Sequence, residues 1–187
     1  CRQVWCVFVF DTDILDKLPR VDRRVAFLRE SVAELDARLR QVGAEQGHTG
    51  TGLIVLNGPG VASIAGLSER LGVQAVFANH DDEPAARQRD AQVLGHLAHH
   101  GTMLHSHKDH VIFERREVLT QTGQTFGVFT PYKNAWLKLV DPAQMVDHDA
   151  SAVADRLAPI PAELDVGVPS LADLGFEPKI SESRDIA

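Results

Sequence analysis

An uninterrupted apolar run over residues 4–10 constrains the fold of this chain more than any other feature. Its residues are mainly β-branched or aromatic, which is typical of a strand buried on both faces of a parallel sheet. A polar loop closed by Pro19 follows the run. From Asp22 to Arg40, apolar residues recur at alternating spacings of three and four, which predicts one amphipathic helix that ends at Gly43.

The same alternation of strand and helix continues to about residue 140. We expect further strands over 53–56, 73–78 and 126–129, short apolar stretches over 102–104 and 111–113, and helices over 64–71, 84–100 and 131–140. This order predicts an α/β fold with a Rossmann-like, doubly wound parallel sheet and helices on both faces, in three layers. Residues 1–140 would form this domain, and residues 141–187, whose periodicity is weak, would form a connector.

In such sheets, ligands bind beyond the carboxyl ends of the strands. The turn over 57–60, N-G-P-G, matches neither phosphate-binding glycine motif, so a plain turn is favoured there. Residues 79–84, N-H-D-D-E-P, place three carboxylates before a helix, with Arg87, Arg89 and Asp90 one to two turns further on. A helix dipole accounts for acids at this position, and a ligand-lining role is the equal alternative.

Composition limits the classes of partner. The net charge of −7, from 19 basic and 26 acidic residues, argues against DNA binding by this chain alone, because phosphate neutralisation dominates such affinity. Two cysteines, Cys1 and Cys6, do not make a disulfide framework, which indicates a reducing cytoplasm. No apolar run is long enough to span a membrane, and no signal segment opens the chain, so we expect no membrane contact.

The histidines and the common catalytic motifs give no sign of a self-contained enzyme. His105, His107 and His110 are spaced unlike the common zinc patterns, so solvated loop histidines are favoured and no metal is predicted. Neither G-x-S-x-G nor H-E-x-x-H occurs. We therefore predict no catalytic residue in this chain.

The segment over 129–136, F-T-P-Y-K-N-A-W, reads as the start of a helix. Thr130 would be its N-cap, and Pro131 would take the first helical position. The segment resembles the F-T-P-[YF]-K-N-A-W element of DNA photolyases and their cryptochrome relatives. Because it follows the last predicted strand, away from the carboxyl-end cleft, we predict a packing and interface element rather than a reactive site.

Further motifs resemble those of the N-terminal α/β domain of DNA photolyases, in the family's order. They are V-F-V-F-D over 7–11 with Ile14 and Leu15, R-V-A-F-L-R-E-S over 24–31, the 79–84 segment with Arg89 and Asp90, K-D-H-V-I-F over 108–113 with V-L-T over 118–120 and Gly123, and P-S-L over 169–171 with L-G-F over 174–176. The family's first strand, with its W-F-R-x-D-L-R loop, and its all-helical FAD domain have no counterpart here. The start at Cys1 and the polar tail beyond Lys179 suggest that the chain is a fragment.

This resemblance implies the light-harvesting domain of a deoxyribodipyrimidine photolyase. In that family, reduced FAD in the helical domain donates an electron under blue light to a cyclobutane pyrimidine dimer flipped out of DNA. An antenna chromophore in the α/β domain passes excitation energy to that FAD. The parent protein would be a carbon–carbon lyase. Its helical FAD domain would be the partner of this chain, and damaged DNA would bind to the parent protein rather than to this chain alone. The fragment alone should be inactive.

The antenna site implied by the resemblance lies at two neighbouring strand ends and on the helix face between them. Its predicted residues are Phe10, Asp11, Ile14, Arg24, Asn79, Asp81 and Glu83. The folate-binding branch of the family carries an Asn-Glu pair where Ala85 and Ala86 stand here. A deazaflavin or flavin is therefore favoured over a folate, and an empty cleft is the remaining option.

Three alternatives stay open. A cryptochrome-type blue-light receptor would use the same domain without repair. A non-photochemical nucleotide-binding α/β module would share the architecture, although the 57–60 turn is a poor phosphate loop. A structural or interaction domain would bury residues 129–136 against a partner.

Overall fold

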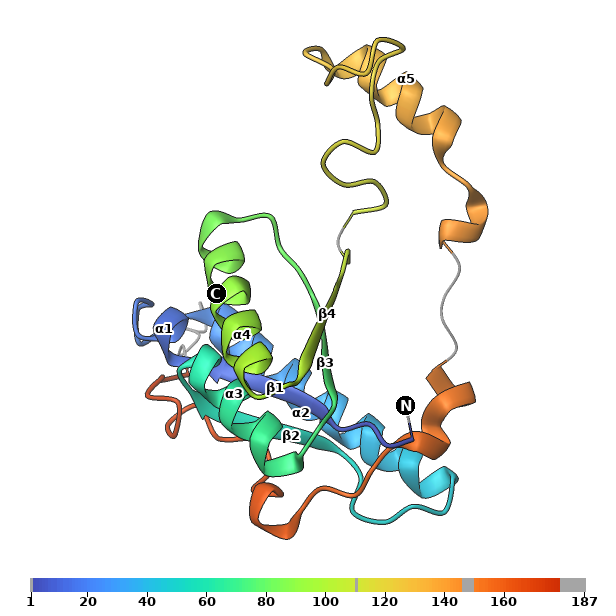
Figure 1. The fold of residues 1–187 in the computed structure, drawn as a ribbon. Helices are drawn as coiled ribbons and strands as arrows, with labels where there is room; N and C mark the ends of the chain where they lie inside the picture. The colour runs from blue at the N-terminus through green and yellow to red at the C-terminus, as the bar shows by residue number, and fades with distance from the viewer. Residues whose placement is uncertain (1, 110, 146–149, 179–187) are drawn as a thin grey trace, which may run out of the picture. The chain divides into compact units, whose positions relative to one another are not determined.

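The computed structural model describes residues 2–109, 111–145 and 150–178. The chain divides into two compact units, each of which is described by itself (Figure 1). Unit 1 comprises Cys1–Ile64 and Asp149–Ala187, and unit 2 comprises Ala65–His148. The expected α/β class with parallel strands is confirmed, but the described strands pair two by two rather than in one continuous sheet. The predicted domain boundary at residue 140 stays a prediction.

Unit 1 is built on strands β1 (Cys6–Asp11) and β2 (Leu53–Gly58), which pair in parallel with Cys6 opposite Leu53. Helix α1 (Thr12–Leu15) follows β1, and the long helix α2 (Arg23–Glu45) packs against β2. The predicted apolar stripe of α2 places two valines in the core. The buried core residues are Phe10, Leu15, Val25, Val32, Leu53, Val55, Leu174 and Phe176.

Two predicted boundaries in unit 1 are wrong. Helix α2 continues through Gly43 to Glu45 instead of ending there. Glycine is needed at this position because a Cβ would overlap the side chain of buried Thr51. Strand β2 continues through Asn57 and Gly58, which the sequence assigned to a turn, since both residues pair with the end of β1.

The described part of the predicted connector beyond residue 150 packs into unit 1. It contains the 3-10 helices η2 (Ala150–Arg156) and η3 (Ala162–Leu164). Val4 donates its backbone N–H to the carbonyl of Arg156 at 2.9 Å and forms an isolated parallel bridge with Leu157. Since Leu174 and Phe176 belong to the same buried core, this late segment completes unit 1.

Unit 2 contains the parallel strands β3 (Ala75–Asn79) and β4 (Met103–His107), joined by helix α4 (Pro84–His99), which packs against β4. Helix α3 (Gly60–Leu71) crosses from unit 1 into unit 2 along the chain. The 3-10 helix η1 (Pro142–Met145) follows the last α-helix, α5 (Phe129–Leu139). No helix in the described part of the chain is long and apolar enough to cross a membrane.

Helix α5 begins earlier than predicted, and the described residues directly before it, 126–128, form no strand. Its N-cap is the extended residue Val128 rather than Thr130. Pro131 then lies in the first turn, where its missing N–H would have no intrahelical partner in any case. The expected strand at 126–129 is absent: Phe129 already belongs to α5, and the ring of Phe126 packs edge-on against Tyr132 of that helix at 6.0 Å.

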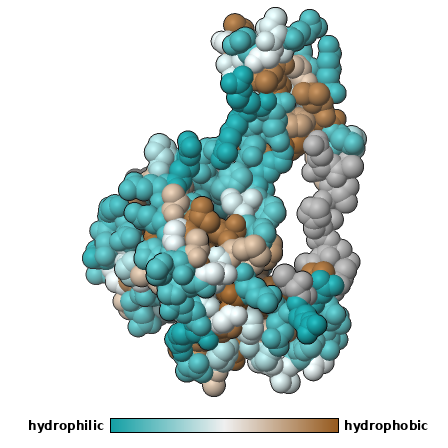
Figure 2. Space-filling view, in the orientation of Figure 1, coloured by the Kyte–Doolittle hydropathy of each residue, from teal (hydrophilic) through white to brown (hydrophobic). Residues whose placement is uncertain are grey.

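Helix α5 buries none of its residues, and Figure 2 shows apolar surface over it. Phe129 is 73 % exposed, and Leu137 and Leu139 are each about half exposed. Trp136 is half-buried and packs edge-on against Phe113 at 5.8 Å. The part played by this segment as an interface element stays a prediction.

Candidate functional site

The end of β1 in unit 1 carries three of the predicted antenna residues. Phe10 is 1 % exposed and packs edge-on against Phe8 within the core. Asp11 directs Oδ1 at two backbone N–H groups, those of Asp13 and Gly60, both at 3.0 Å. This carboxylate therefore caps α1 and binds the first residue of α3, while Ile14 on α1 keeps an exposed side chain.

Arg24, the fourth predicted residue of unit 1, lies in the first turn of α2. Its guanidinium donates to the carboxylate of Asp22, with an Nη2–Oδ2 distance of 2.6 Å. Asp22 is also the N-cap of α2 and accepts the backbone N–H of Arg24. These hydrogen bonds hold the pKa of the Asp22 carboxyl below its usual value.

The end of β3 in unit 2 carries the other three predicted residues. Asn79 is the last residue of the strand and pairs with His107 of β4. Asp81 accepts the backbone N–H of Glu83 at 3.0 Å, which shapes the loop before α4. Glu83 is the N-cap of α4, but its side chain makes no capping hydrogen bond. The structure thus places these residues between the end of β3 and the start of α4.

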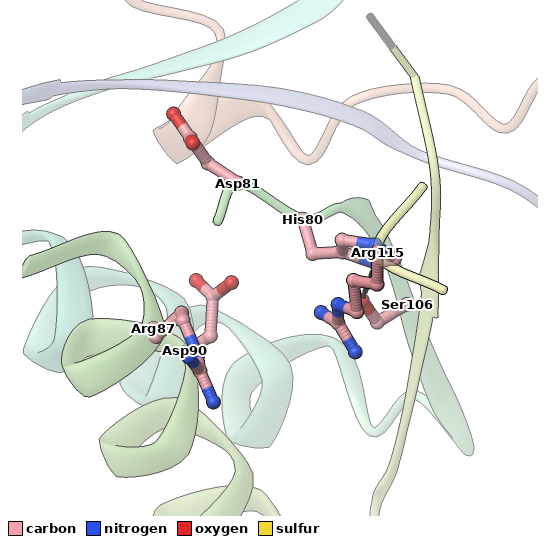
Figure 3. A pocket seen from close by; sticks show the side chains of 6 residues that line it. All are labelled: His80, Asp81, Arg87, Asp90, Ser106 and Arg115. Carbon is pink, nitrogen blue, oxygen red and sulfur yellow. Dashed lines mark hydrogen bonds between the residues drawn. The ribbon is translucent and has the colours of Figure 1, made fainter. Parts of the chain in front are cut away.

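A pocket of about 360 Å³ lies at this end of unit 2 (Figure 3). It is lined by His80, Asp81, Arg87, Asp90, Ser106 and Arg115. The lining comes from the loop after β3, the first two turns of α4, the end of β4 and the irregular segment that follows it. All six side chains are polar or ionisable, so the pocket offers hydrogen-bond donors and acceptors of both charge signs.

His80 connects three parts of this pocket. Its Nδ1 lies 2.7 Å from the hydroxyl of Ser106, and its Nε2 lies 2.6 Å from a carboxylate oxygen of Glu114. Its backbone N–H donates to the carbonyl of His107 at 2.9 Å, which extends the pairing of β3 with β4. The imidazole is therefore fixed in place on both sides.

The segment over 108–117 is attached to the loop after β3 by a further ion pair. Arg115 adopts a positive φ of 48° and donates from Nε to Asp82 at 3.0 Å. Lys108 donates to the carboxylate of Glu117 at 2.8 Å, and this bond lowers the pKa of that carboxyl. The Arg115–Asp82 pair and the His80–Glu114 contact thus hold the segment beside the pocket, while the Lys108–Glu117 pair joins its two ends.

Of the seven predicted antenna residues, only Asp81 lines this pocket. Four of the seven belong to unit 1 and three to unit 2, and the antenna site they would form together stays a prediction. Arg87 was recognisable in the sequence only as an ion-pair partner for the acids of the loop, and Asp90 only as part of the motif that it forms with Arg89. Ser106 and Arg115 gave no local signal, because they reach the pocket through strand pairing and a contact across 33 residues of sequence.

The histidines of β4 do not lie in a loop, contrary to expectation. The ring of His105 stacks on Phe77 at 4.7 Å, and His107 lies parallel to the same ring at 6.3 Å. His110 lies outside the described residues. Within the described ranges, no three His, Cys, Asp or Glu side chains are grouped so that they could hold a metal ion. Cys6 is a half-buried free thiol whose pKa is raised by burial.

Comparisons with known proteins all point to one family. A family model described as DNA photolyase matches residues 1–153. The deoxyribodipyrimidine photo-lyase of Synechococcus sp. is 28 % identical over 91 % of this chain and 34 % of its own length. A cryptochrome DASH of Natronomonas pharaonis is 28 % identical over 87 % of this chain and 32 % of its own length. The chain thus spans about a third of the length of these curated relatives.

A solved structure agrees in fold. The crystal structure of a bacterial class III photolyase from Agrobacterium tumefaciens matches with a TM-score of 0.60 and 21 % sequence identity. The match covers 74 % of this chain and 27 % of the photolyase chain.

Proposed function

Since the chain belongs to the DNA photolyase family, we propose that it is the light-harvesting domain of a deoxyribodipyrimidine photolyase. The observation that carries this proposal is the family match over residues 1–153, which covers most of the chain. Relatives named deoxyribodipyrimidine photo-lyase support the parent activity, which is light-driven repair of cyclobutane pyrimidine dimers.

In this proposal the repair reaction requires FAD, which a separate helical domain of the parent protein would hold. The chain described here supplies excitation energy to that FAD. The parent acts in the cytoplasm and binds damaged DNA outside this acidic domain. The net charge of −7 supports that assignment, because a surface that neutralises DNA phosphates needs an excess of Lys and Arg.

The antenna chromophore we propose is a deazaflavin or flavin. When bound, such a group absorbs near-ultraviolet or blue light and passes the energy on. The role of this chain is to hold the ring in a fixed orientation and to keep water from quenching it. Polar side chains at the carboxyl end of β3, together with the exposed Ile14 on α1, are the groups offered for contact.

The first test is chromophore binding by the chain. Purified chain would be mixed with riboflavin, FMN or a deazaflavin, and bound chromophore measured by fluorescence after gel filtration. Ile14→Ala tests unit 1 and Glu83→Gln tests unit 2, with Val166→Ala as a matched apolar truncation at an exposed position. We expect weaker binding in both variants and no change in the control. Failure of every chromophore to bind would contradict the antenna function.

The second test separates repair from signalling. The similarity to a cryptochrome DASH favours a blue-light receptor as the second candidate. Dimer repair by the full-length parent under blue light would support the photolyase function, and repair absent from a parent that binds FAD would support the receptor. The chain alone should not repair dimers. Repair by the chain would contradict the proposal that the reaction requires the FAD domain of the parent.

A further inference from the structure

We propose that Ser106 is an activated nucleophile that attacks small polar carboxylic esters, with His80 as its general base and Glu114 as the acid that orients the imidazole. This activity goes beyond the antenna function and does not depend on it. Sequence motifs gave no sign of it, because the three residues come from separate segments that meet only in the folded unit 2.

The three side chains form one continuous series of hydrogen bonds. The hydroxyl of Ser106 lies 2.7 Å from Nδ1 of His80, and Nε2 of the same ring lies 2.6 Å from a carboxylate oxygen of Glu114. The side chains of His80 and Glu114 are only 17 % and 21 % exposed, so water competes little for this contact. A serine within reach of a base that a third group orients is the arrangement by which hydrolases activate their nucleophile.

The carboxylate decides which ring nitrogen can act as the base. An ionised carboxylate only accepts hydrogen bonds, so Nε2 of His80 carries the proton that Glu114 accepts. In the neutral ring Nδ1 is then an acceptor, and the hydroxyl of Ser106 donates to it. This is the protonation state that a general base needs. The two nitrogens exchange roles relative to the commoner triad, in which Nε2 faces the serine.

The pocket gives a substrate access to Ser106. This residue is exposed and lines the cavity of about 360 Å³ together with His80, which leaves room for a small ester. Figure 3 shows the Arg115 guanidinium extending into the same pocket. It donates to Asp82 through Nε, and its Nη groups can donate to an oxyanion that forms on the ester carbonyl. All six lining side chains are polar or ionisable, so a polar short-chain ester fits better than a fatty acyl ester.

The reaction needs only the ester and water. The oxygen of Ser106 bonds to the carbonyl carbon as its proton passes to Nδ1 of His80, and the carbonyl electron pair moves onto oxygen. Collapse of this oxyanion breaks the bond to the alcohol, which departs with the proton from His80 and leaves an ester on Ser106. Water, activated by the same nitrogen, then releases the acid. The charge of Glu114 stabilises the imidazolium that forms in both stages.

A fluorophosphonate probe tests the nucleophile, because such probes bond covalently to activated serines. We expect the purified chain to be labelled on Ser106, as located by mass spectrometry of its peptides, and to hydrolyse nitrophenyl acetate through an acetylated Ser106. Ser106→Ala should abolish both. Ser31→Ala is the control, because this hydroxyl donates to a backbone carbonyl of α2, and both readouts should stay unchanged. If Ser106 is not labelled, the proposal is overturned, while the antenna function is unaffected.

Two further variants test the base and the acid. His80→Asn should lower the rate of labelling about a hundredfold, because the proton acceptor is lost. Glu114→Gln keeps an oxygen that can accept from Nε2 but loses the charge, so kcat for nitrophenyl acetate should fall about tenfold with KM unchanged. Glu34→Gln removes the same charge from an exposed position on α2 and should change neither constant. Circular dichroism shows whether each variant is folded, and an unchanged kcat in folded Glu114→Gln would overturn the role of this acid.

Discussion

The carboxylate of Asp11 accepts the backbone N–H of Gly60 at 3.0 Å, and so joins the end of β1 to the first residue of α3. The same oxygen accepts the N–H of Asp13, which caps α1. The resemblance assigned Asp11 to a chromophore site, and the structure shows that it also joins the end of β1 to the first turns of α1 and α3. Its replacement should therefore affect stability whether or not a chromophore is present.

Asp11→Ala should lower the free energy of unfolding by about 1–3 kcal/mol, because two backbone N–H groups lose their acceptor. Urea denaturation followed by circular dichroism measures this change. Asp13→Ala removes an exposed carboxylate two residues away and should cost only a few tenths of a kcal/mol. Equal losses in the two variants would show that the Asp11–Gly60 bond contributes nothing specific.

Gly43→Ala should destabilise the chain, although alanine is the better helix former. The new Cβ would overlap the side chain of Thr51, which is 2 % exposed, so the expected loss is about 1–3 kcal/mol. Gly95→Ala on α4 is the matched control, because nothing lies within 4 Å of its Cβ position. That variant should gain about 0.5–1 kcal/mol from helix propensity. Thermal melts of both variants test whether Gly43→Ala lowers the melting temperature and Gly95→Ala raises it.

His80→Ala should release the segment over 108–117 from the strand ends. The substitution removes both the Ser106 and the Glu114 contacts. Trypsin should then cleave after Lys108, Arg115 and Arg116 several times faster, because cleavage requires local opening. His96→Ala, at an exposed position on α4, should leave the cleavage rate unchanged. An unaltered rate in His80→Ala would mean that the Arg115–Asp82 pair is sufficient to hold the segment.

Asp165→Asn should weaken unit 1 at neutral pH but not in acid. Arg40 donates to Asp165 at 2.6 Å, and this hydrogen bond lowers the pKa of the Asp165 carboxyl. A depressed pKa contributes stability above the unfolded-state value, and the contribution is lost as pH falls through the folded-state value.

Both partners of this pair are about one-third exposed, so solvent screening limits the expected loss at pH 7 to about 0.5–1 kcal/mol. Urea denaturation at pH 7 and at pH 3 measures it, with Asp155→Asn as an exposed control of the same charge change. The loss should shrink at the lower pH. A loss of the same size at both pH values would rule out an electrostatic origin.

Local patterns predicted the elements well and their ends less well. The apolar run over 4–10 and the stripe of α2 follow from side-chain periodicity, which depends on nearby residues alone. The end of α2 did not follow, because the role of Gly43 depends on Thr51, which lies beyond the helix. The start of α5 was displaced as well: its N-cap is Val128, and Phe126, expected in a strand, packs on Tyr132 of the helix.

The pocket shows the same limit more strongly. Asp81 was predictable, because it follows a strand and precedes a helix, where ligands of α/β proteins gather. Arg115 was not, since it reaches Asp82 across 33 residues of sequence that include α4 and β4. To predict that Ser106 lines the pocket, one would need the register of β4 against β3, which no short motif specifies. Long-range pairing therefore decides which polar residues share a site.

The pairing of Val4 with Arg156 and Leu157 has a consequence for synthesis on the ribosome. Unit 2 is one continuous stretch of chain, so all its residues are available once about residue 148 has emerged. Unit 1 must wait for Leu174 and Phe176, which complete its core from far downstream. Until then the apolar faces of β1 and α2 lack the side chains of Leu174 and Phe176, and the exposed apolar surface can associate with other unfolded chains. In the order of translation, the inserted unit can therefore fold before the unit that surrounds it in sequence.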